Sequence, residues 1–251
     1  MVTKLLSLTF LFVVGSVSGW CLEILFRRFF SAKKWINPGF LTGPYLPLYG
    51  FGLVGLYLIC LIPVNTPYIW LNAVITILIM GVLMTVIEYV AGIIFIKGMK
   101  IKLWDYSERP GNIQGIICPL FSFFWTLIGV LYYFVIDPFV IVWVEWFVQN
   151  MAFAFVVGFF FGVMCIDFAH SVNLSVRIRR FAAERGVVVA FERLKESIKD
   201  GIEKVKDGIE ENGKKRRKAS LLFPFKSSET LEEQLKKYVE KNRDNEISRR
   251  K

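Results

Sequence analysis

The chain has 251 residues, of which 55% are hydrophobic and 21% are charged, and its formal net charge is +10. Residues 1–170 hold 9 Lys+Arg against 7 Asp+Glu, whereas residues 171–251 hold 22 against 14. This division excludes a single soluble enzyme, a collagen-like chain, a disulfide scaffold and a wholly disordered protein. We expect an all-α, polytopic membrane bundle in residues 1–170 and a basic cytosolic tail, helical and partly disordered, in residues 171–251.

Five apolar stretches approach the roughly 20 residues that a helix needs to cross the hydrocarbon core. They are residues 5–26, 46–62, 69–96, 113–136 and 147–168, and the second is short and rich in glycine. Segment 138–148 contains Trp143 and Trp146 and is either an interfacial helix or an extension of the fifth span. A signal peptide is a less favoured interpretation of residues 1–20, because the apolar run continues to Phe26.

Lysine and arginine residues alternate between the connections, which predicts the orientation of the spans. They occur after the first span, after the third and at the start of the tail, whereas residues 63–68 and 137–145 contain none. Because positive loops stay in the cytosol, we expect a multi-pass protein of the cytoplasmic membrane with its N-terminus outside and its C-terminus in the cytosol.

Three acidic residues lie within or at the edge of apolar spans, namely Glu23, Glu88 and Asp167. Each comes late in a span that runs from outside to inside, so all three are placed in the cytosolic half of the membrane. Ionisable groups at that depth usually face a bundle interior or a water-filled cavity. For Asp167, simple hydration at the level of the lipid headgroups is the favoured alternative.

Two irregular connections are predicted on the same side as these acids. Residues 37–52 contain three prolines and four glycines, which favours a broken, partly re-entrant start to the second span over a tight turn and a kinked helix. Residues 103–119 are dense in aromatic and polar side chains, and Asn112 resembles a helix N-cap. The order of acid, basic loop, Asn, Gly and Pro recurs in both halves, which indicates a weak parallel repeat.

The motifs of these segments also carry a family resemblance. They resemble the bacterial family called putative ABC-transporter permease, type IV (CmpB-like), over roughly residues 15–170. The resemblance implies a transport role in a bacterial inner membrane, and Pro110-Gly111 and the charged tail depart from the family pattern. The residues that carry it are Gly19-Trp20, Glu23, residues 37–44, Pro47, residues 49–52, Glu88-Tyr89, residues 103–107, Asn112, Gly115 and Cys118.

The tail contains an apolar stripe at helical spacing between residues 191 and 209, typical of an amphipathic helix that lies on a membrane or pairs with a partner. A basic block follows it. The block favours anionic lipid over nucleic acid, and a solvated run of charge is the alternative. Its residues are Lys214, Lys215, Arg216, Arg217 and Lys218.

No phosphate-binding loop, nucleophile elbow or metal-binding constellation is present in the sequence, so we expect no cofactor and favour a non-enzymatic role. Any ATP-driven work then requires a separate ATPase subunit, and a second copy of the chain is another partner to consider. The main hypothesis is transport of a small polar or ionic substrate through a cytosol-facing cavity with acidic and aromatic walls. The alternatives are an intramembrane enzyme that uses Glu23, Glu88 and Asp105 on a lipid-linked substrate, and a membrane-anchored regulator or scaffold. The candidate substrate- or ion-binding residues are Glu23, Asn37, Gly43, Tyr49, Glu88, Tyr89, Trp104, Asp105, Tyr106 and Asn112.

Overall fold

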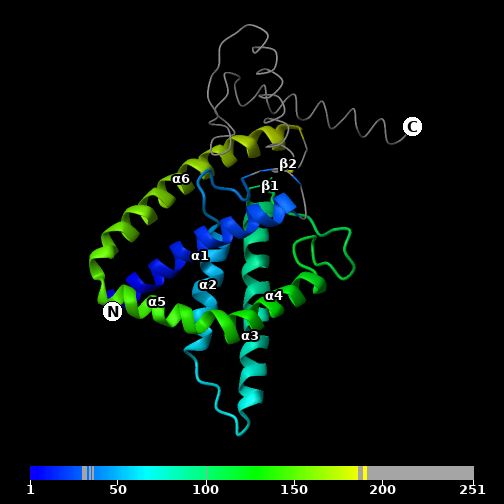
Figure 1. Cartoon of the computed structure of the whole chain (residues 1–251). Coiled ribbons are helices and arrows are strands. Elements are labelled where there is room, and N and C mark those ends of the chain that lie inside the picture. The colour runs from blue at the N-terminus through cyan, green and yellow to red at the C-terminus, as the bar shows by residue number, and fades with distance from the viewer. Residues whose placement is uncertain (30–32, 34, 36, 100, 186–188, 191–251) are drawn as a thin grey trace.

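The computed structural model describes residues 1–29, 33, 35, 37–99, 101–185 and 189–190 (Figure 1). The predicted all-α architecture is confirmed, apart from two strands of two residues each, β1 (Ile101–Lys102) and β2 (Val189–Ala190), which pair in parallel. The helices are α1 (Val2–Phe29), α2 (Pro47–Cys60), α3 (Ile69–Gly92), α4 (Pro119–Leu131), α5 (Asp137–Gln149) and α6 (Ala154–Arg185). The π-helical segments Ile93–Gly98 (η1) and Tyr132–Ile136 (η2) follow α3 and α4, and a 3₁₀ turn, Met151–Phe153 (η3), precedes α6.

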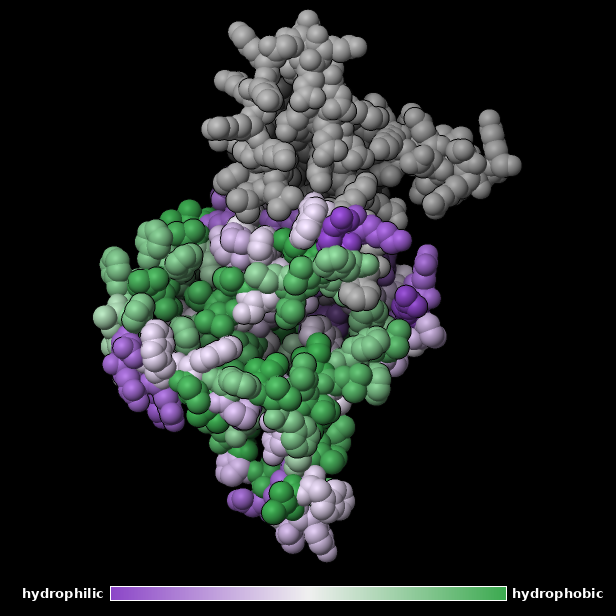
Figure 2. Space-filling model, viewed as in Figure 1, coloured by the Kyte–Doolittle hydropathy of each residue, from purple (hydrophilic) through white to green (hydrophobic). Residues whose placement is uncertain are grey.

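Four helical stretches are long and apolar enough to cross a membrane: Val2–Phe29, Ile69–Ile96, Pro119–Gln149 and Met151–Asn173. Besides these four stretches, there is a shorter apolar helix, α2, which has 14 residues. It therefore measures about 21 Å, which is less than the roughly 30 Å of a hydrocarbon core. Hydrophobic side chains cover most of the visible face of the body in Figure 2. The chain is thus a multi-pass membrane protein in which the second span is short and follows a non-helical segment.

The fourth span differs from the prediction at both of its ends. Residues 137–145 are not a connection, because α4, η2 and α5 form one continuous apolar stretch from Pro119 to Gln149. Pro138 lacks a backbone N–H and a proline usually breaks a helix, but here the wider π-helical turn of η2 directly precedes it and the helix continues. Segment 138–148 thus extends the fourth span, which is neither of the two predicted roles.

At its N-terminal end, this span begins later than expected. Residues 113–118 form a turn in which Ile113 bridges Ile117, and α4 begins at Pro119, a residue suited to the first helical position. The N-cap residue is Cys118 and no side chain caps the helix, so the interpretation of Asn112 as the N-cap was wrong.

The connection between α5 and α6 lies beside the N-terminus, away from both the β1–β2 pair and the turn between α2 and α3 (Figure 1). The pairing of β1 with β2 brings the chain after α3 beside the chain after α6, and the end of α1 and the start of α2 lie in the same region. The turn between α2 and α3 lies at the opposite end. The predicted orientation of the spans, including the side of the membrane on which each connection lies, stays a prediction. The amphipathic stripe of residues 191–209 and the basic block Lys214–Lys218 lie outside the described residues. The predicted division of the chain at residue 170 falls inside α6 and also stays a prediction.

The packing of α1 against α2 depends on small residues. Gly19 lies against the ring of Tyr49 so closely that an added Cβ would overlap the ring, and Gly15 lies in the same way against Leu53. Small residues let two helix backbones approach closely, which is the main source of helix association in a membrane. Tyr49 can therefore sit directly on the surface of α1.

We predict that Gly19→Val destabilises the protein by about 1–3 kcal/mol, because the added methyl groups overpack the contact with Tyr49. Thermal unfolding of the detergent-solubilised chain measures the effect. Gly158→Val on α6 is the matched control, since no atom lies within 4 Å of a Cβ built at Gly158. Equal shifts in the two variants would contradict the packing described here.

Candidate functional site

Glu88 is buried in the membrane body and both of its carboxyl oxygens accept hydrogen bonds from aromatic side chains. It lies near the end of α3 with a relative exposure of 4%. The hydroxyl of Tyr106 donates to Oε1 over 3.0 Å, and the indole N–H of Trp125 on α4 donates to Oε2 over 2.9 Å. Among the described residues no lysine or arginine lies within ion-pair distance of Glu88. Its carboxyl group is therefore held by neutral donors alone.

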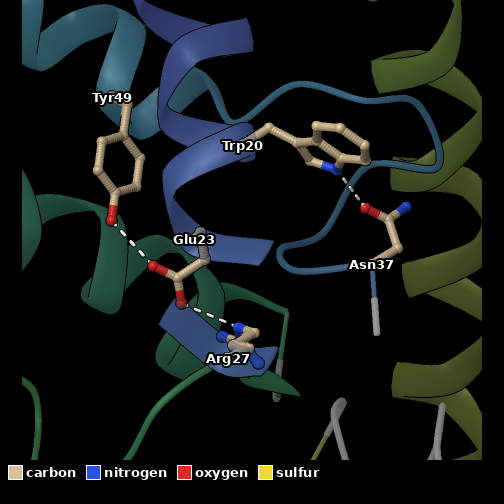
Figure 3. Close-up of polar contacts among 5 residues, drawn as sticks. All are labelled: Trp20, Glu23, Arg27, Asn37 and Tyr49. Carbon is tan, nitrogen blue, oxygen red and sulfur yellow. Dashed lines mark hydrogen bonds and ion pairs between the residues drawn. The ribbon is translucent and has the colours of Figure 1, made fainter. Parts of the chain in front are cut away.

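Glu23 near the end of α1 is held in a related way, as Figure 3 shows. The hydroxyl of Tyr49 donates to Oε2 over 2.9 Å, and Nε of Arg27 donates to Oε1 over 2.9 Å. Gly19 and Glu23 lie four residues apart on one face of α1, so the ring that packs on Gly19 places its hydroxyl on Glu23. The difference from Glu88 is that Glu23 has a cation, Arg27, as a partner.

The two acids belong to one group of side chains. The rings of Tyr49 and Trp125 meet edge to face with centroids 6.4 Å apart. We call this group the two-acid cluster. Its members are Glu23, Arg27, Tyr49, Glu88, Tyr106 and Trp125.

The segment before α2 is folded against α1 rather than exposed. Asn37, with an exposure of 4%, accepts a hydrogen bond from the indole of Trp20 over 2.6 Å and donates to the carbonyl oxygen of Thr42 over 2.8 Å (Figure 3). The backbone N–H of Leu46 donates to the carbonyl oxygen of Ser16. Asn37 thus helps to shape the irregular segment through its hydrogen bonds to Trp20 and Thr42.

Asp167 on α6 holds the same segment from the other side. Its carboxylate accepts hydrogen bonds from the backbone N–H groups of Thr42 and Gly43, over 3.1 and 2.8 Å, and from the hydroxyl of Tyr45 over 2.8 Å. Burial and the hydrogen bond to Asp167 raise the pKa of Tyr45 far above its usual value, so the phenol stays a neutral donor. Asp167 thus holds the irregular segment, while its expected hydration at the headgroup level stays a prediction. Gly43 serves as a backbone donor to this carboxylate.

Residues 103–118 form a compact loop with its own internal contacts. The indole of Trp104 donates to the carbonyl oxygen of Ile116, and Asp105 accepts from the backbone N–H of Ser107. Asn112 donates to the carbonyl oxygen of Arg109 and accepts from the N–H of Gly115. In this loop only Tyr106 reaches a cluster acid, through the hydrogen bond to Glu88.

The structure therefore divides the ten predicted site residues into four sets. Glu23, Tyr49, Glu88 and Tyr106 meet in the two-acid cluster, whereas the predicted wall residue Trp104 and the acid Asp105 support the loop beside it. Tyr89 follows Glu88 on α3 and so points about a quarter turn away. Asn37, Gly43 and Asn112 organise the two connections. Sequence reasoning missed Trp125, which lies in an apolar run without a distinguishing signal.

Both halves of the bundle repeat this construction. In each, an acid on the first helix is held by an aromatic donor from the second, and the second helix begins at a proline, Pro47 or Pro119. Each connection contains a glycine with positive φ, Gly39 at 80° and Gly115 at 67°. The structure is in this respect consistent with the weak parallel repeat inferred from the sequence.

The family model described as putative ABC-transporter type IV (ABC_trans_CmpB) matches residues 10–172, which include every residue of the two-acid cluster. The chain belongs to this family. No curated protein and no solved structure shows a significant match to the chain. Membership of the CmpB-like family confirms the resemblance seen in the sequence and agrees with a multi-pass membrane protein.

Within the described part of the chain, no three His, Cys, Asp or Glu residues form a group that could hold a metal ion.

We predict that Asp167→Asn loosens the segment before α2, because hydrogen bonds to a charged carboxylate contribute about 1.5–3 kcal/mol. Hydrogen–deuterium exchange at the amides of Thr42 and Gly43 should become at least roughly tenfold faster. Glu108→Gln removes an exposed acid from the other connection and serves as the control. Unchanged exchange at Thr42 and Gly43 would show that Asp167 does not hold this segment.

Proposed function

We propose that the chain is the membrane-spanning subunit of a transporter in which a small polar or ionic substrate passes the two-acid cluster on the cytosolic side. The observation that carries this proposal is the meeting of Glu23 from α1 and Glu88 from α3 in one group inside an apolar body. Ionisable residues within spans are costly and commonly mark substrate or ion pathways. Membership of a family described as an ABC-transporter type supports the same role.

The arrangement of the cluster corresponds to a closed form of such a pathway. All four carboxyl oxygens accept a hydrogen bond from the chain itself, through Arg27, Tyr49, Tyr106 and Trp125. In the proposed open form, a substrate with ammonium or hydroxyl donors replaces the two tyrosine hydroxyls. Tyr49 is in the first turn of the short α2, and Tyr106 is in the loop after α3.

The energy for transport is assigned to a separate ATPase subunit, since the sequence contains no phosphate-binding loop. Such a subunit would dock on the end of the bundle where the positively charged connections gather, which the positive-inside rule places in the cytosol. The basic block Lys214–Lys218 would hold the tail against anionic lipid at the same surface. The enzyme alternative is weaker, because Asp105 accepts hydrogen bonds from Ser107 in its own loop rather than joining the two acids.

We predict that Glu23→Gln and Glu88→Gln each reduce transport at least roughly tenfold, because a charged partner of the substrate worth about 1.5–3 kcal/mol is lost. Metabolite profiling of cells with and without the protein first identifies compounds whose accumulation depends on it. The variants are then compared for those compounds at equal protein level in the membrane. Glu108→Gln, an exposed acid outside the cluster, should transport normally. Wild-type transport by both cluster variants would remove the proposal.

A further inference from the structure

A second polar group lies at the other end of α2, remote from the two-acid cluster. Tyr49 is in the first turn of α2 and Cys60 is its last residue, so the rise of the helix separates them by about 16 Å. The side chains between the two levels are apolar and buried, and they include Leu11, Leu56, Met80 and Met84. We call the group at Cys60 the far-end cluster. Its members are Tyr57, Cys60, Tyr132 and Asp137.

Two buried polar atoms of the far-end cluster have no partner at ordinary hydrogen-bond geometry, although the Tyr132 hydroxyl and the Cys60 thiol both lie beside the Asp137 carboxyl group. The hydroxyl of Tyr132 is one, and this residue has an exposure of only 1%. The Oδ1 atom of Asp137 is the other. An unsatisfied buried polar group costs about 1–3 kcal/mol and more for a charged one, so such atoms in a native structure call for a partner.

The backbone directs both groups toward the same place. Tyr132 and Asp137 are the first residue and the C-cap of the π-helical segment η2, and the N–H of Asp137 donates to the carbonyl oxygen of Tyr132. This i→i+5 bond puts the two residues on one face, one turn apart, and π-helical turns occur frequently at functional sites. On α2, Tyr57 and Cys60 are three residues apart and share a face. Both of them, like Tyr132, lie within the electrostatic influence of Asp137.

The charge around Asp137 is not balanced by the described part of the chain, where no lysine or arginine lies within ion-pair distance of it. The groups that face it are the two phenols and the thiol from α2 and η2. The core that contains Tyr132 includes apolar side chains of α1 and α3, among them Phe10, Leu11, Met80 and Leu83. Glu145 on α5 adds a second negative charge that acts on Tyr57. The surroundings thus favour a positive ligand.

We propose that the far-end cluster binds a small monovalent cation, with Oδ1 of Asp137 and the hydroxyl oxygen of Tyr132 as ligands. Carboxylate and hydroxyl oxygens are hard ligands that suit a hard cation. One carboxylate balances one positive charge, and no three His, Cys, Asp or Glu residues are grouped among the described residues as a divalent metal would favour. Sodium, potassium and hydronium ions share this chemistry. Binding is independent of the proposed function, whereas the use of the ion to drive transport rests on it.

Thermal unfolding of the purified full chain in detergent tests the proposal. The melting temperature is measured in NaCl, in KCl and in N-methyl-D-glucamine chloride of equal ionic strength, and in the last salt also over a range of pH. A ligand that binds only the folded protein raises the melting temperature. Tyr132→Phe removes only the unpartnered hydroxyl, Asp137→Asn removes the charge, and Glu145→Gln removes an exposed acid from the same helix as a control.

We expect wild type and Glu145→Gln to be stabilised by one of the ions, and at least a tenfold weaker apparent affinity in both Tyr132→Phe and Asp137→Asn. A response to NaCl or KCl identifies a metal ion, and a response to acid in N-methyl-D-glucamine chloride alone identifies hydronium. Equal responses of wild type and both cluster variants, or no response to any ion or to acid in wild type, would overturn the proposal. Because no transport is measured, this outcome is distinct from failure of the proposed function.

Discussion

A carboxyl group inside an apolar helix bundle must find donors within the protein, because lipid supplies none. This requirement shapes the centre of the molecule. Glu23 and Glu88 each take an aromatic donor from the helix that follows in the chain, and the second oxygen is satisfied by Arg27 or by Tyr106. The hydrogen bonds therefore tie α1 to α2 and α3 to α4, and the edge contact of Tyr49 with Trp125 joins the two pairs.

The rest of the bundle supports these contacts. Tyr49 reaches Glu23 because Gly19 leaves room for its ring on α1, and the start of α2 is positioned by the segment that Asn37 and Asp167 hold. Asp167 comes from α6, so the last span also contributes to the geometry around the first acid. The irregular segment before α2 can lie against the spans without helical hydrogen bonds, because the carboxylate of Asp167 on α6 and the backbone carbonyl of Ser16 on α1 accept hydrogen bonds from its backbone N–H groups. Proline and glycine in that segment are thus compatible with a buried position.

Hydropathy and the positions of charged residues were sufficient to predict a multi-span helical protein and two irregular connections, and they placed Glu23 and Glu88 late in their spans. These features depend on local composition and on the direction of each span. The hydrogen-bond donors of the acids were predicted less well. Trp125 was missed because it stands in an apolar run, where the sequence does not distinguish an indole that only packs from one that donates a hydrogen bond. The contact of Asp167 with Thr42 and Gly43 joins segments more than 120 residues apart, which no local pattern reveals. The fourth span was cut too early because a proline usually ends a helix, and the π-helical turn before Pro138 could not be read from the sequence.

The two polar clusters lie at opposite ends of α2, with the two-acid cluster at its start and the far-end cluster at its last residue. Apolar side chains separate them. This division is what a membrane pathway in a closed form requires, since a continuous polar path would leak. Membership of the CmpB-like family agrees with the proposed transport role.

The most direct test of the central claim is a double-mutant cycle of Glu23→Gln and Glu88→Gln in the free energy of unfolding, measured by detergent denaturation in mixed micelles. If the two acids share one cluster through Tyr49 and Trp125, the effects of the single changes do not add, and the coupling free energy is at least about 0.5 kcal/mol. Single effects that add to within about 0.3 kcal/mol would contradict the claim, because they would mean that the two acids occupy independent sites.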